Sequence, residues 1–249
     1  NMIVRNDRAG VAVLRMEHGK ANALDLELSA GLVQALDDAS DAKAVVLTGT
    51  GGIFCAGVDL VRLTSGGAEY VKTFLPALDG ALRALFHFPR PMIAAMNGHA
   101  IAGGCILAAA CDHRVMARGE GRVGVAELLV GVPFPPLALE LMRARLPFSA
   151  FQEAVLTGRV YGTEAALARG FVDELVDAPK LLDRAVEVAT QMGSVPAKTF
   201  DVTKRMIALP IYEAVELSEG EFGDEVSGIW TSGDALGAVK AYVARTLKK

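Results

Sequence analysis

The sequence has few of the residues that indicate a metal site or a disulfide framework. Its 249 residues include three cysteines and four histidines, with no C-x-x-C pair and no H-x-x-x-H spacing. An odd number of isolated cysteines argues against disulfides, and the missing ligand spacings argue against zinc. We therefore expect no metal, and we interpret Cys55, Cys105 and Cys111 as small buried side chains.

Long apolar runs and an excess of positive charge are also missing. The longest apolar stretches, such as residues 101–111, are too short to cross a bilayer, and the N-terminal residues show no signal-peptide core. The formal net charge is −4, whereas nucleic-acid-binding proteins concentrate basic residues on a patch. These absences predict a cytoplasmic protein with no membrane insertion and no nucleic-acid partner.

The residues that are present predict an α/β core followed by helices. Hydrophobic residues make up 52% of the chain and charged residues 22%, as in an ordinary globular domain. Apolar runs or alternation predict strands over residues 11–18, 44–50, 91–98 and 113–118. Amphipathic spacing predicts helices over residues 26–38, 68–88, 136–146, 148–157, 163–169, 178–192, 196–208, 212–228 and 232–247. We expect a core of residues 2–190 and a helical region of residues 191–249.

Three common cofactor and catalytic motifs are incomplete. The glycines of VVLTGTGGIF follow a predicted strand, but the dinucleotide motif G-x-G-x-x-G would need glycine where Phe54 stands. Gly19 and Lys20 lack the earlier glycine of a phosphate-binding loop, and no G-x-S-x-G occurs. Nucleotide-dependent and α/β-hydrolase chemistry are therefore disfavoured.

Two glycine-containing loops follow predicted strands, GGIFCAGVDL at residues 51–60 and NGHAIAGGC at residues 97–105. Two strand ends that meet can each offer a backbone N–H to one point, which is the geometry of an oxyanion hole. Gly103 and Gly104 open an apolar helix, and a residue without Cβ lets another molecule approach the backbone closely. Glycine-rich turns after strands are common, so a purely structural turn is the alternative.

A single charge, Glu127, stands in the apolar segment VGVAELLVGVPFP at residues 123–135. Burying an unpaired carboxylate is costly, so this group is paired, protonated or active. Desolvation raises the pKa of a carboxyl group, which allows it to take up a proton and then return it. A salt-bridged or helix-terminal glutamate is the other interpretation of this fragment.

In this order and spacing, FCAGVDL, PMIAAMNGHAIAGGCILAAACDHRVM and VGVAELLVGVPFP resemble the crotonase (enoyl-CoA hydratase/isomerase) superfamily. The similarity extends from GKANALD at residues 19–25 to AKTFDVTKRMI at residues 197–207. It implies a spiral of ββα repeats with a helical C-terminal region, and an acyl-CoA thioester substrate with no separate cofactor. It also implies a homo-oligomer, trimer or hexamer, and a place in fatty acid metabolism.

The resemblance assigns roles to individual residues. The backbone N–H groups of Val58 and Gly103 would form the oxyanion hole. Positions where the family binds the adenine and pantetheine of coenzyme A are occupied by Ala21, Ala23, Ala56, Asp59 and Leu60. Lys20 and Arg62 are expected partners for the coenzyme A phosphates, although Arg62 is offset by one from the family's usual basic position.

One position departs from the hydratase pattern. Hydratases of the family hold a water between two glutamates, and here the first of these positions is Ile106 and the second is Glu127. An isoleucine can neither orient a water nor protonate a carbon, and the pattern resembles 3-enoyl-CoA to 2-enoyl-CoA isomerases, which need one carboxylate. We therefore favour an isomerase in which Glu127 moves a proton from C2 to C4 beside an apolar wall that includes Ile106. The alternatives are an enoyl-CoA hydratase, another acyl-CoA lyase or decarboxylase of the family, and a non-catalytic acyl-CoA or RNA-associated protein.

Overall fold

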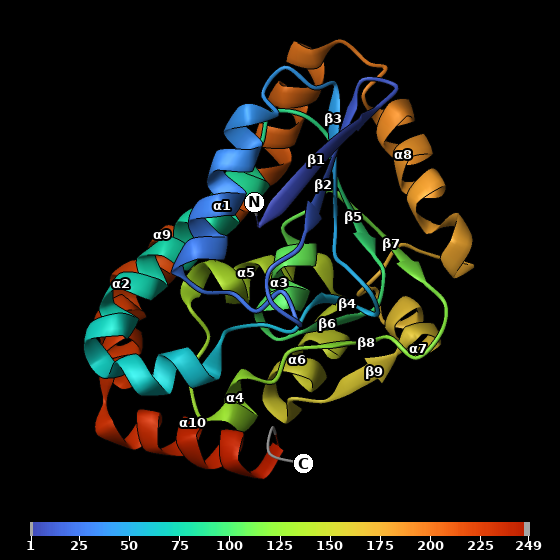
Figure 1. Cartoon of the computed structure of the whole chain (residues 1–249). Helices are drawn as coiled ribbons and strands as arrows, with labels where there is room; N and C mark the ends of the chain where they lie inside the picture. The colour runs from blue at the N-terminus through green and yellow to red at the C-terminus, as the bar shows by residue number, and fades with distance from the viewer. Residues whose placement is uncertain (1, 247–249) are drawn as a thin grey trace.

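Two β-sheets form the centre of the protein, and helices surround them (Figure 1). The computed structural model describes residues 2–246. The larger sheet has the order β1 (Ile3–Arg8), β2 (Val11–Met16), β3 (Ala44–Thr48), β5 (Met92–Met96), β7 (His113–Ala117) and β10 (Glu174–Val176). The smaller sheet has the order β4 (Ile53–Cys55), β6 (His99–Ile101), β8 (Arg122–Gly124) and β9 (Val160–Gly162). Pairing is parallel except between β1 and β2 and between β8 and β9.

A repeated β-β-α segment connects the two sheets. β3, β5 and β7 each place one strand in the larger sheet, and the strand that follows each of them joins the smaller sheet. A helix comes next in every repeat: α2 (Leu60–His87), α3 (Gly103–Ala109) or α4 (Glu127–Val130). Because β4, β6 and β8 are neighbours, the starts of these three helices come together. The predicted ββα spiral is therefore confirmed, and its geometry brings Val58, Gly103 and Glu127 to one place.

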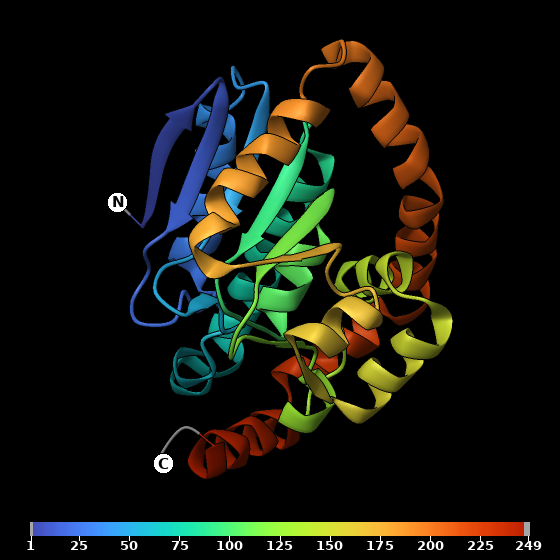
Figure 2. The same ribbon diagram turned by 90° about the vertical axis from the view of Figure 1, so that its right-hand side faces the viewer.

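The remaining helices cover the sheets and form the C-terminal region. They are α1 (Leu26–Asp38), α5 (Pro136–Arg145), α6 (Phe148–Thr157), α7 (Thr163–Ala168), α8 (Leu181–Met192), α9 (Ala197–Thr231) and α10 (Gly233–Thr246), with a 3-10 turn at Ala178–Lys180. Figure 2 shows α8 lying across one face of the larger sheet, where Leu181 and Val188 join a buried cluster with Val46 and Ile93. The other face is covered by the larger core, to which α1, α2 and α3 contribute.

Several predicted boundaries are wrong, each for a local reason. The helices expected over residues 196–208 and 212–228 form one helix, α9, which continues through Pro210. A proline removes one backbone hydrogen bond, but Ala208 and Val215 on either side of it are both buried in the core and hold the helix together. α2 begins at Leu60 rather than at residue 68, and its break lies at Gly67, where φ is +62°. The sequence does not predict the three-residue strands, since three residues show no periodicity, nor β1, whose residues IVRNDR do not alternate between apolar and polar.

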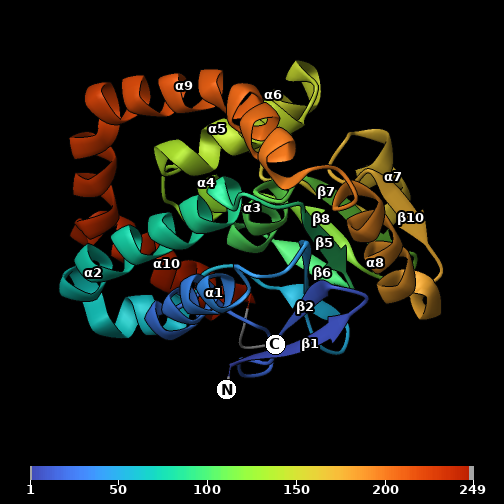
Figure 3. The same cartoon turned by 90° about the horizontal axis from the view of Figure 1, so that it is seen from above.

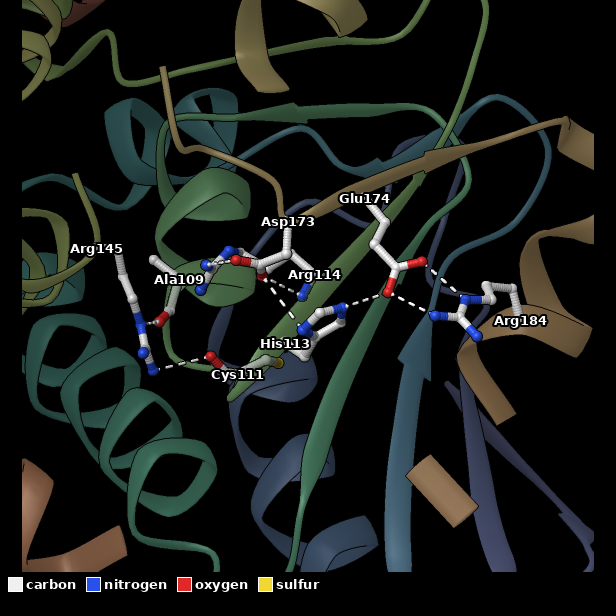
Figure 4. Close-up of polar contacts among 8 residues, drawn as sticks. All are labelled: Ala109, Cys111, His113, Arg114, Arg145, Asp173, Glu174 and Arg184. Atoms are coloured by element: carbon white, nitrogen blue, oxygen red, sulfur yellow. Dashed lines mark hydrogen bonds and ion pairs between the residues drawn. The ribbon is translucent and has the colours of Figure 1, made fainter. Parts of the chain in front are cut away.

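Polar contacts fix the position of α3, whose first residues approach the site. The guanidinium of Arg145 on α5 donates hydrogen bonds to the carbonyls of Ala109 (2.8 Å) and Cys111 (2.9 Å), as Figure 4 shows. These carbonyls lie at the end of α3, where helix carbonyls lack intrahelical partners. Beside them, Arg114 on β7 pairs with Asp173 at 2.8 Å. The hydrogen bonds from Arg145 therefore anchor the C-terminal end of α3 to α5.

The C-terminal helices cover the chain's own core. The Lys204 ammonium on α9 pairs with Asp112 at 2.8 Å, and both side chains are largely buried. α10 packs against α2 and α4, and Figure 1 shows it running beneath both. Of the helix predicted over residues 232–247, the last residue lies outside the described part of the chain. The sequence left open which subunit this tail covers, and in this structure it covers its own.

Candidate active site

Two backbone segments approach each other closely at the predicted oxyanion hole. Gly57 has a φ of +88°, and a Cβ at this residue would lie 2.8 Å from the carbonyl oxygen of Ile101 and 3.3 Å from the nitrogen of Gly103. Only glycine accepts both this φ and this approach without strain. Gly104 is equally constrained, because its Cβ would lie 2.0 Å from the carbonyl oxygen of Cys55. The glycines thus allow the loop before α2 to pack directly against the start of α3.

The N–H groups of Val58 and Gly103 donate to no residue among residues 2–246. Leu24 pairs with the chain on both sides of Val58: its N–H donates to the Gly57 carbonyl (2.8 Å), and its carbonyl accepts from the Asp59 N–H (2.9 Å). On the other segment, Ala102 adopts a φ of +49°, which is rare for a residue with a side chain. Ala102 is the residue before α3, so the N–H of Gly103 belongs to the first turn of the helix, where N–H groups have no intrahelical acceptor. Two free donors in contacting segments are the arrangement that stabilises an oxyanion.

Glu127 is the first residue of α4, and its carboxyl group is buried in the same region. The residue is 7% exposed, and its Oε2 has no hydrogen-bond partner in the described structure. Burial raises the pKa of Glu127 from its ordinary value of 4.5 to about 7, against a smaller lowering by the N–H groups of Glu127 and Ala126. A carboxyl group with a pKa near neutrality can both accept and return a proton.

A cavity of about 380 Å³ joins these features. Nine residues that the sequence proposed for the site line it: Ala21, Ala23, Ala56, Val58, Asp59, Leu60, Gly103, Ile106 and Glu127. The loop of Ala21 is held against the second segment, since the Ala56 N–H donates to the Ala21 carbonyl at 3.1 Å. The structure therefore places the expected oxyanion donors, the carboxylate and the residues expected to contact the adenine and pantetheine of coenzyme A in one pocket.

The two basic residues proposed for the coenzyme A phosphates are not among the residues lining this cavity. Arg62 forms ion pairs with Asp25 (3.1 Å) and with Glu27, and its guanidinium lies 5.3 Å from the ring centre of Tyr70. A phosphate at Arg62 would have to compete with two carboxylates. Lys20 is exposed and precedes the lining residue Ala21 by one position.

Several lining residues had no signal in the sequence. They come from the second half of α2, from α5 and its preceding loop, and from the C-terminal helices: Leu78, Leu82, Val132, Pro135, Ala138, Trp230 and Tyr242. Nothing in a single sequence shows that residues so far apart along the chain share one cavity. Their side chains make this part of the pocket apolar.

Asp59 and Glu127 are the two carboxylates among the lining residues, and their surroundings differ. Asp59 is partly exposed, and its Oδ1 accepts the backbone N–H of Arg62 at 2.9 Å as the N-cap of α2. The position beside the oxyanion hole is occupied by Ile106, which is 3% exposed. Glu127 is thus the buried carboxylate of the pocket, without a second one across from it.

The described residues contain no cluster of three side chains suited to holding a metal ion. None of the helices in that part of the chain combines the length and the apolar character that a membrane crossing requires.

Comparisons with known proteins point to one family. Residues 6–215 match the family described as "Enoyl-CoA hydratase/isomerase". The chain is 28% identical over 211 residues to the mitochondrial enoyl-CoA delta isomerase 1 of Rattus norvegicus, covering 83% of this chain and 73% of the relative.

Two solved structures share the fold over nearly the whole chain. One is titled a probable enoyl-CoA hydratase, EchA3, from Mycobacterium tuberculosis: 30% identity, TM-score 0.83, covering 99% of each chain. The other is the human mitochondrial delta3-delta2-enoyl-CoA isomerase, at 22% identity and a TM-score of 0.93, covering 100% of this chain and 99% of that one. The names of these relatives divide between hydratase and isomerase.

Proposed function

The chain belongs to the enoyl-CoA hydratase/isomerase family, and from that premise we propose that it is an isomerase that converts 3-enoyl-CoA to 2-enoyl-CoA. One observation carries the proposal: Glu127 is a lone buried carboxylate in the pocket, and Ile106 stands where hydration would require a second acid. The names of the relatives allow either activity, so the choice rests on this pair of residues.

The geometry supports a mechanism with one proton carrier. The thioester oxygen would accept hydrogen bonds from the N–H groups of Val58 and Gly103. Glu127 in its ionised form takes a proton from C2, the C2–H electron pair moves to form the enolate, and the negative charge is held at the oxyanion hole. Glu127 then returns the proton to C4 as the double bond shifts to C2 and C3. The carboxylate is regenerated, so no other acid or base is consumed.

The apolar lining of the pocket disfavours hydration. A catalytic water needs polar partners to hold it in place, and apolar lining residues such as Ile106 and Val130 offer none. Asp59 accepts a hydrogen bond as the cap of α2 at the exposed side of the pocket. With one buried acid, a proton can be moved within the substrate, whereas positioning a water would need a second polar group.

The test is to supply the purified protein separately with a 3-enoyl-CoA and a 2-enoyl-CoA and to identify the products by mass and absorbance. We expect an unchanged mass and conversion between the two double-bond positions. A mass gain of one water from 2-enoyl-CoA, at a rate equal to or above isomerisation, would instead assign the protein as a hydratase. Absence of turnover with either substrate, together with tight acyl-CoA binding, would indicate a binding protein.

We also propose a cytoplasmic homo-oligomer, a trimer or a hexamer, that acts in fatty acid metabolism. α9 carries large apolar side chains that remain exposed, among them Met206 (70%), Ile207 (65%) and Leu217 (74%). Such side chains are typical of surfaces that another subunit covers. Light scattering at micromolar concentration would refute this proposal if it reported a monomer.

A further inference from the structure

The pocket runs from an exposed mouth to a buried end. At the mouth, Ala56 is exposed and Val61 is 56% exposed. At the other end, Leu82 and Ala138 are 2% exposed and Trp230 is 3% exposed. These three residues belong to α2, α5 and α9, and Figure 3 shows α9 passing beside α5 and α2. The buried end of the pocket is therefore built by helices that pack on one another.

Trp230 is fixed in place at this end and offers the pocket an apolar surface. Its indole N–H donates a hydrogen bond to the carbonyl of Pro133 at 2.9 Å, which satisfies its one polar atom. The bond holds the ring against the segment that leads into α5. Its neighbours in the lining, such as Leu78, Val132 and Ala138, are aliphatic. A polar group placed among them would lose its water without gaining a partner.

We infer that Trp230 closes the acyl end of the pocket and sets the longest unbranched, apolar acyl chain that the enzyme accepts. The inference rests on the proposed function, because it takes the thioester to lie at Val58 and Gly103. With the coenzyme A portion at the exposed mouth, the acyl tail continues past Glu127 toward the buried end. Chains that stop short of Trp230 gain affinity with each carbon, and longer chains do not fit. Chains that carry a hydroxyl or carboxyl group near their end are rejected.

Trp230 reports its own contact with the ligand, because it is the single tryptophan of the sequence. The experiment titrates the whole protein with coenzyme A and with saturated acyl-CoAs of increasing length, which cannot isomerise, and follows tryptophan emission. We expect no change with coenzyme A or acetyl-CoA and a shift once the chain reaches Trp230. Affinity should rise roughly fourfold per methylene, equivalent to about 0.8 kcal/mol, and should stop rising just beyond that length. Emission that stays constant for every acyl-CoA that binds by calorimetry would overturn the inference.

Two variants move the limit in opposite directions. Calorimetry measures the limit in the variants, because Trp230→Leu removes the one tryptophan. Trp230→Leu should lengthen the optimal chain by two carbons or more, and Ala138→Leu, which places a larger side chain in the pocket, should shorten it. Phe171→Leu is the matched control, since Phe171 is 4% exposed but does not line the pocket, and it should leave the limit unchanged. If Trp230→Leu does not fold, Ala138→Leu alone decides. An unchanged limit in the folded variants would refute the role of Trp230.

The ligands keep this result separate from the isomerase proposal. Saturated acyl-CoAs test the pocket without any reaction. A chain-length limit at Trp230 without isomerase turnover would refute the proposed function and leave the pocket assignment standing. Isomerase turnover without such a limit would refute the pocket assignment and leave the proposed function standing.

Discussion

Replacing Glu127 by glutamine should remove catalysis and at the same time stabilise the protein at alkaline pH. Glutamine keeps the shape of the side chain but cannot accept the C2 proton. We expect isomerisation to fall by about 100- to 10,000-fold, the usual contribution of a positioned acid or base. Binding of a saturated acyl-CoA should change little, because the oxyanion donors are backbone groups.

The stability effect follows from the buried carboxyl group. Folding raises the pKa of Glu127 from 4.5 to about 7. Between these values the folded protein keeps the proton and the unfolded chain loses it, so wild-type stability falls as pH rises through this range. At about 1.4 kcal/mol per pKa unit, the penalty reaches about 3.5 kcal/mol above pH 7. Glu127→Gln has no such penalty, so its stability relative to wild type should increase by that amount between pH 4.5 and pH 8.

Two assays check these expectations. Urea unfolding at fixed protein concentration, at several pH values, measures the change in relative stability, and the comparison across pH cancels the packing cost of the amide itself. Wild-type kcat/KM should rise tenfold per pH unit below about pH 7 and level off above it, since the ionised carboxyl group is the base. Glu120→Gln serves as the control, because Glu120 is exposed and lies outside the pocket.

Either of two results would refute the reasoning. A stability difference between Glu127→Gln and wild type that is constant from pH 4.5 to pH 8 would mean that Glu127 is not held in a desolvated site. Isomerase activity within tenfold of wild type in a folded Glu127→Gln protein would mean that another group moves the proton.

Three further predictions concern the neighbours of this carboxylate and the anchoring of α9. Gly103→Pro removes the N–H donor and should lower turnover by about 100- to 1,000-fold. Gly103→Ala, which keeps the N–H and displaces only the end of Leu24, should cost much less; equal losses in both variants would argue against the donor role. Ile106→Glu introduces a second carboxylate into the pocket lining. It should yield hydration of 2-enoyl-CoA that mass spectrometry detects, at some loss of stability from the newly buried carboxyl group. Hydration no faster than in the wild type would contradict the role of Ile106 as an apolar wall that keeps water out. Lys204→Met removes the ion-pair partner of Asp112. Urea titrations should show a loss of about 3 to 5 kcal/mol in the free energy of unfolding, as for other broken buried pairs. A loss below about 1 kcal/mol would show that the pair does not anchor α9.

The chemistry of the site could largely be predicted from the sequence because it is encoded locally. Gly103 and Gly104 show their backbone requirement through residue type alone, and Glu127 shows its burial through its apolar neighbours. The resemblance to the crotonase superfamily, which implies a spiral of ββα repeats, then predicts that these segments meet. The proposed oxyanion donors and the buried carboxylate all come from these short segments.

The limits of the pocket and the partners of its charges were decided by the tertiary structure. The sequence predicts that Arg62 is available to bind a phosphate, but in the folded chain it forms ion pairs with Asp25 and Glu27. Trp230 is more than 100 positions from Gly103 along the chain, and it reaches the pocket because α9 continues through Pro210 and packs beside α5 and α2. Such contacts depend on which apolar helix faces bury one another. Which helix faces pack together depends on the shape of the whole core, and it cannot be predicted from local spacing along the chain.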